Sequence, residues 1–134
     1  MIERKSGDFF AAITDIRARQ LAFLDYTATF YNANNRATVG PRCVYRATPN
    51  SPGCAIGQFM SPDLAAKCQG TITDLFNDKE HLHQLPSWMV EMGRGFLVVI
   101  QDLHDEESLW NDAGLTDYGK SRYNKIVERF ALAA

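Results

Sequence analysis

The sequence lacks the features that assign a chain to several large classes of protein. No window approaches the roughly 18 apolar residues of a membrane span, and the first residues carry charges in place of the apolar run of a signal peptide. No C-x2-C pair, P-loop or dinucleotide-binding glycine pattern is present. We therefore expect a soluble cytoplasmic protein with no membrane association, no metal and no cofactor.

Cysteine and clustered positive charge are also scarce. The chain has three cysteines and a formal charge of −2 at pH 7. An odd number of cysteines without a secretion signal is typical of free thiols. The negative balance and the absence of a dense Lys/Arg cluster disfavour nucleic acid as a partner, because binding to phosphates depends on such clusters.

What is present is typical of one globular domain. The 134 residues are 46% hydrophobic and 22% charged, and a chain of this size can bury a core that needs no disulfide or metal. No linker divides it. We predict a single domain over residues 1–134.

Helical periodicity dominates both ends of the chain. The first pattern predicts one long helix from Ser6 to Tyr31, with Arg17 and Arg19 pointing away from a buried face formed by Phe9, Ile13, Ile16, Phe23 and Phe30. Shorter helices are expected over 61–70 and 71–77. Two further helices are expected, one ending near Asp105 and one starting at Thr116, with apolar faces formed by Phe96, Val99, Ile100 and Leu103, and by Tyr123, Ile126, Val127 and Phe130.

The stretch 42–59 carries the clearest strand signals. Two short runs, 43–48 and 54–59, flank five residues of turn chemistry, which favours a β-hairpin. Pairing Thr48 with Cys54 would place Tyr45 opposite Gly57 and would put Cys43 too far from Cys54 for a disulfide. The predicted fold class is α+β, with four or five helices packed around a small antiparallel β-hairpin.

Three motifs in the middle of the chain occur together in a known group. Cys43–Tyr45, Cys54–Gly57 and Ile100–Asp105 resemble the C-x-Y, C-A-[IV]-G and L-Q-x-x-H-D segments of small uncharacterised proteins of tailed phages and prophages. The resemblance covers residues 42–105. It implies a phage or mobile-element origin, and it brings no established activity.

One combination of residues could support catalysis. Cys54 could act as a nucleophile with His104 as its base and Asp105, or Asp102, orienting the imidazole, because a nearby histidine generates the reactive thiolate. Neighbours on a helix do not face each other, so Asp105 is expected to be a poor orienter for His104. The structural alternative is that Cys54 is a small buried side chain and that His104 packs near a helix end.

A second set of residues suggests a binding surface. Its members are aromatic or Met side chains in two segments of the sequence: Trp88, Met89, Met92, Phe96 and Trp110. Such side chains suit a protein-binding patch when exposed, and the alternative is that they form core. The leading hypothesis is a non-enzymatic phage or mobile-element protein that binds or inhibits a host or phage macromolecule, for example in host-defence inhibition. The other is a cysteine-dependent hydrolase or transferase; a homodimer is allowed as much as a monomer.

Overall fold

The structure is a computed structural model that describes residues 5–35, 38–39, 42–43, 55–59, 77 and 85–132. The described part confirms the predicted α+β class. Its α-helices are α1 (Gly7–Ala11), α2 (Ile16–Phe30), α6 (Ser87–Val90), α7 (Arg94–Asp105) and α8 (Asp117–Arg129). The described part also contains two antiparallel hairpins: β1 (Thr38–Val39) pairs with β2 (Arg42–Cys43), and β3 (Trp110–Asn111) pairs with β4 (Gly114–Leu115). Its two 3-10 helices are η1 (Gly57–Phe59) and η2 (Glu107–Leu109).

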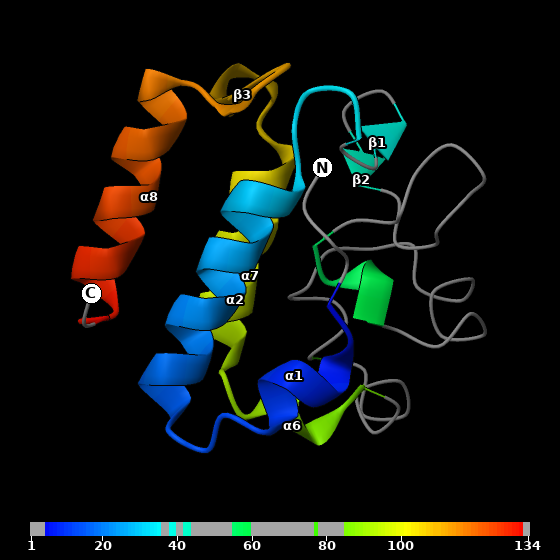
Figure 1. Cartoon of the computed structure of the whole chain (residues 1–134), viewed down its shortest axis with the longest axis vertical. Coiled ribbons are helices and arrows are strands. Elements are labelled where there is room, and N and C mark those ends of the chain that lie inside the picture. The colour runs from blue at the N-terminus through cyan, green and yellow to red at the C-terminus, as the bar shows by residue number, and fades with distance from the viewer. Residues whose placement is uncertain are drawn as a thin grey trace.

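Helices α2 and α7 pack together at the centre of the described structure (Figure 1). Helix α8 runs antiparallel to α2 and contacts both of them, while α1 and α6 lie together near the start of α2. The β3–β4 hairpin lies at the other end, where β4 contacts both α2 and α8. Within the described ranges, no helix has the length and apolarity to cross a lipid bilayer.

The long first helix of the prediction is wrong, because the chain breaks between α1 and α2. The side chain of Asp15 accepts a hydrogen bond from the Ala18 backbone N–H at 2.8 Å and so caps α2. The break turns Phe10 into the core, where it is fully buried, and leaves Phe9 44% exposed. Phe9, the first residue of the predicted buried face, is therefore on the surface.

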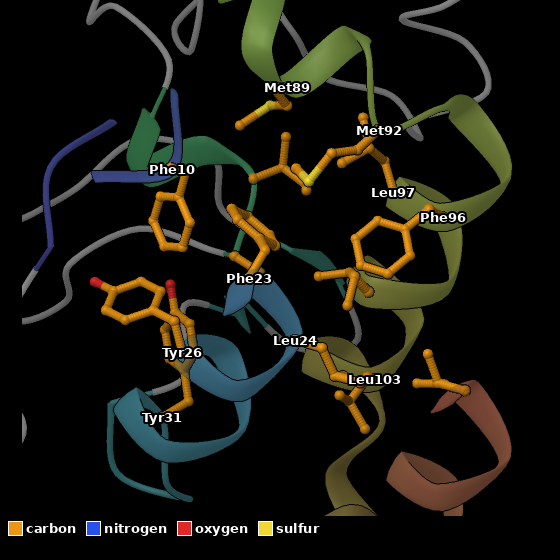
Figure 2. Packing of buried hydrophobic residues seen from close by; sticks show 14 of the residues in the cluster. Phe10, Phe23, Leu24, Tyr26, Tyr31, Met89, Met92, Phe96, Leu97 and Leu103 are labelled. Atoms are coloured by element: carbon orange, nitrogen blue, oxygen red, sulfur yellow. The ribbon is translucent and has the colours of Figure 1, made fainter. Parts of the chain in front are cut away.

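Side chains from α1, α2, α6 and α7 converge in one hydrophobic core (Figure 2). Phe10 stacks on Trp88 with ring centroids 5.4 Å apart and meets the Phe23 ring edge-on at 5.1 Å. Burying one large apolar side chain stabilises the fold by roughly 1.5–3 kcal/mol. The aromatic contacts fix how α1 and α6 close over the start of α2.

The predictions for the last two helices are confirmed. Helix α7 ends at Asp105 and buries the predicted residues Phe96, Ile100 and Leu103. Thr116 caps α8, since its hydroxyl accepts a hydrogen bond from the Gly119 backbone N–H at 3.0 Å. The spacing of the apolar residues in the sequence was therefore enough to predict both helices.

The predicted hairpin over 43–48 and 54–59 is wrong where the structure describes it. Cys43 pairs with Thr38 in the β1–β2 hairpin, and Gly57 lies in η1, not opposite a strand. Ala55, Ile56 and Gly57 are all buried, whereas a strand with one solvent-facing side alternates. Residues 44–54, with Tyr45 and the turn, lie outside the described residues. So do the helix predicted over 61–70 and, except for residue 77, the helix predicted over 71–77.

Candidate functional site

The aromatic and Met residues predicted to form a binding surface lie in the core. Their exposed fractions are 8% for Trp88, 0% for Met89, 2% for Met92, 1% for Phe96 and 5% for Trp110. The Trp110 indole N–H donates a hydrogen bond to the Leu103 carbonyl at 2.8 Å, so its polar atom is satisfied inside the protein. The surface interpretation of these five side chains is therefore wrong, and the core alternative holds.

His104 and Asp105 contact each other, although they are neighbours on α7. The distance from His104 Nδ1 to Asp105 Oδ1 is 2.8 Å. The expectation that Asp105 orients His104 poorly is therefore wrong, because the carboxylate lies within hydrogen-bonding distance of the ring. A carboxylate only accepts hydrogen bonds, so Nδ1 donates and Nε2 is the acceptor nitrogen of the neutral ring.

The His104 ring is fully buried. It meets the Tyr31 ring edge-on, with centroids 4.7 Å apart. Asp105 Oδ1 also accepts a hydrogen bond from the Gln101 side-chain amide at 3.0 Å. Both contacts fix the orientation of the imidazole–carboxylate pair, and the spacing of four residues between Gln101 and Asp105 is a signal that sequence reasoning could have used.

Tyr31 links the His104 pair to a second group of polar side chains. The Gln58 amide donates to the Tyr31 hydroxyl at 2.8 Å, and the Tyr26 hydroxyl donates to Gln58 Oε1 at 2.8 Å. Tyr26 and Tyr31 belong to α2 and its C-cap, and Gln58 belongs to η1. Sequence analysis missed Gln58 because its role depends on residues about 30 positions away.

Asp102 and Cys54, the other two residues of the catalytic hypothesis, are not seen in contact with His104 in the described part of the chain. Partial loss of solvation, followed by the negative charge of Asp105, raises the pKa of the Asp102 carboxyl. Within the described ranges the Asp102 side chain makes no hydrogen bond, so Asp105 is the acid that touches His104. Cys54 lies outside the described residues. No cluster of three metal-ligating side chains occurs in the part of the chain that the structure describes.

A groove between α2 and α8 is the second candidate site. One hollow of about 860 Å³ lies between the C-terminal half of α2, the β3–β4 hairpin and the first turns of α8. A second, of about 500 Å³, lies beside the N-terminal half of α2 and reaches Ala131 after α8. Both are lined by Asp25. The two hollows therefore lie on either side of Asp25 along α2.

The groove carries charges that the protein itself does not neutralise. Three carboxylates and two cationic side chains line it: Asp15, Asp25, Asp117, Arg17 and Lys120. Within the described structure none of these five forms an ion pair. Between them the lining is small or apolar, with Ala18, Ala22, Ala28 and Leu21. Ligand sites combine an apolar lining with a few polar groups that fix the orientation of the ligand.

Asp25 and Tyr123 join the two walls of the groove. The Tyr123 hydroxyl donates a hydrogen bond to Asp25 Oδ1 across the space between α8 and α2. Burial, followed by the hydrogen bond to Asp25 and the charge of Asp25, raises the pKa of Tyr123 to about 12. The tyrosine is therefore a neutral donor at physiological pH, and the carboxylate is fixed in position.

Comparisons of the chain with protein-family models, with curated proteins and with solved structures found no match. The groove is open and charged, whereas the His104 ring is fully buried.

Proposed function

We propose that the protein is a non-enzymatic binding protein that holds a segment of a protein partner in the groove between α2 and α8. The observation that carries the proposal is the set of five charged side chains that line this groove without an ion pair in the described structure. Exposed charges beside an apolar floor supply orientation and contact area for a partner. The groove takes the place of the five aromatic and Met residues as the proposed binding surface, because those residues lie in the core.

The class of partner follows from the motif resemblance. Because the motifs at Cys43–Tyr45, Cys54–Gly57 and Ile100–Asp105 resemble those of tailed-phage proteins, we propose a host or phage macromolecule met in the cytoplasm. Inhibition of a host-defence protein is the role that we favour. Binding that blocks a partner needs no catalytic group.

Affinity capture with matched groove variants tests this proposal. Ala18 is exposed and lines the groove, while Ala11 is exposed at the end of α1 outside it. Ala18→Arg should abolish capture of a partner from host lysate, because the long side chain fills the groove. Ala11→Arg should leave capture unchanged. A partner retained equally by both variants, or no partner at all, would refute the groove as the binding site.

The His104–Asp105 contact favours a second candidate function, a cysteine-dependent hydrolase or transferase. The 2.8 Å contact orients the imidazole with Nε2 as its acceptor nitrogen, as a general base for Cys54 requires. Full burial of His104 weighs against it, since a general base has to reach the reacting groups.

Thiol labelling separates the two candidates. If Cys54 is a nucleophile, a thiol-reactive probe at neutral pH should label it faster than Cys43 and Cys68, and His104→Ala should remove the difference. Equal and slow labelling of all three thiols in the folded protein would rule out the enzyme.

A further inference from the structure

One exposed face of α2 carries opposite charges that cannot pair with each other. Arg17 and Asp25 are exposed and line the smaller hollow, and within the described part of the chain neither belongs to an ion pair. They are eight residues, or ~12 Å, apart along the helix, whereas helix side chains meet at spacings of three or four residues. The hydrogen bond from Tyr123 occupies Oδ1 of Asp25 and leaves Oδ2 for a cation from another molecule.

The arrangement of these charges is self-complementary. Arg17, Leu21 and Asp25 follow one another at intervals of four residues, so they form a single row along α2. A two-fold axis at Leu21 that sets two α2 helices antiparallel brings Arg17 of each copy beside Asp25 of the other. Side-by-side packing of such rows is the commonest way in which two helices meet. One rotation therefore satisfies both charges of both copies.

The rest of this face lets a second helix approach. Ala18 and Ala22 flank the row and line the same hollow as the half-buried Leu21. In Figure 1, α2 lies in front of α7 and α8 stands at its side, so neither of these helices covers the face. Small side chains allow two helices to come close together, and Leu21 of one copy then meets Leu21 of the other at the axis.

Charge also selects the register of the two helices. An axis at position 20 in place of 21 would bring Asp15 of each copy to Asp25 of the other. Both are exposed carboxylates that line the smaller hollow, and like charges brought together across an interface cost binding energy. The axis at Leu21 avoids this repulsion.

We infer that two copies of the chain pair antiparallel through this face of α2, with Arg17 of each copy bound to Asp25 of the other. The pairing occupies the smaller hollow, so the second copy and the partner of the proposed function compete for the groove. The dimer needs no other protein, and its existence is therefore independent of the proposed function.

Sedimentation equilibrium of charge-reversed variants tests the inference. Arg17→Glu opposes two acids and Asp25→Arg opposes two cations, so each should weaken the dimer about tenfold or more. An equimolar mixture of the two variants should pair again, because one copy then carries acids at both positions and the other carries cations. Arg94→Glu is the matched control: Arg94 is exposed at the start of α7, away from the hollow, and forms no ion pair in the described structure. It should leave the dimer unchanged.

Three outcomes would overturn the inference. A wild-type chain that stays monomeric up to about 1 mM would leave the smaller hollow open to a different protein. Equal weakening by Arg17→Glu and Arg94→Glu would show an effect of net charge alone. A mixture that is no more dimeric than either reversed variant, with circular dichroism showing both to be folded, would reject the pairing of positions 17 and 25. Failure to capture a partner from lysate would bear only on the proposed function.

Discussion

The guanidinium of Arg19 donates a hydrogen bond to the Trp88 backbone carbonyl at 2.9 Å, joining positions 69 residues apart inside the core. The same side chain donates to the Ile13 carbonyl at 2.9 Å and to Glu91 at 3.1 Å. Arg19 is only 4% exposed. It therefore holds the α1–α2 turn and α6 together by satisfying carbonyl groups that the turns leave unpaired.

Arg19→Met should destabilise the protein by about 2–4 kcal/mol, because it keeps most of the apolar stem but leaves the buried Trp88 carbonyl and the partly buried Ile13 carbonyl without their donor. Urea unfolding measures the effect. Glu91→Gln is the matched control: the Glu91 side chain is 57% exposed, so its loss should cost less than about 1 kcal/mol. Equal losses for the two variants would show that the ion pair, and not the carbonyl groups, carries the stabilisation.

Two glycines near helix N-termini should respond in opposite directions to substitution by alanine. A Cβ at Gly119 would lie 2.3 Å from the Leu109 carbonyl oxygen and 2.8 Å from Leu115 Cδ2, whereas a Cβ at Gly95 would meet nothing within 4 Å. Gly119→Ala should destabilise by about 3 kcal/mol through this overlap. Gly95→Ala should stabilise by about 0.5 kcal/mol, because it restricts the unfolded chain. Thermal unfolding of both variants compares them, and a neutral Gly119→Ala would disprove the close approach of α8 to η2.

Local patterns predicted the two C-terminal helices because their signals lie within each segment. Helix α7 shows apolar residues at helical spacing, and Thr116 is a strong N-cap before α8. The break at Asp15 was missed because a helix can also carry an aspartate on its outer face. The packing of Phe10 against α2 and α6 is what distinguishes a continuous helix from one that begins after Asp15.

The candidate sites were harder to predict because their residues are polar. Periodicity assigns polar residues to solvent, so Arg19 was expected outside the core although distant carbonyl groups satisfy it there. His104 and Asp105 were both named as candidates, but their contact was not expected, because neighbours on an ideal helix point in different directions. The groove depends on how α2 and α8 pack, and its only local signal is the spacing of Ala18 and Ala22 on α2.

His104 should carry its neutral-state proton on Nδ1. The Asp105 carboxylate accepts at 2.8 Å, so the ring nitrogen facing it has to donate. ¹⁵N NMR of the imidazole distinguishes the tautomers, and His104→Gln assigns the signal. Asp105→Leu should remove the preference and lower stability by about 1–3 kcal/mol, since a charge-assisted hydrogen bond is lost. A signal typical of the Nε2–H tautomer in the wild type would contradict the orientation.

Stability above pH 10 should depend on Tyr123. Its pKa is raised to about 12 in the folded protein, first by burial and then by the hydrogen bond to Asp25 and the charge of Asp25, while an unfolded tyrosine titrates near 10. Between these two values the unfolded chain releases a proton that the native protein keeps. The stabilisation is therefore complete below about pH 10 and is lost as pH rises toward 12.

Urea unfolding at a series of pH values measures this loss, and ultraviolet absorbance of tyrosinate follows the titration itself. Tyr123→Phe should flatten the fall of stability over this range. Asp25→Asn should lower the pKa of Tyr123 toward its ordinary value, because it removes the negative charge beside the hydroxyl but keeps an acceptor. If the Tyr123→Phe profile still falls as steeply as that of the wild type, the hydrogen bond between α8 and α2 does not form in solution.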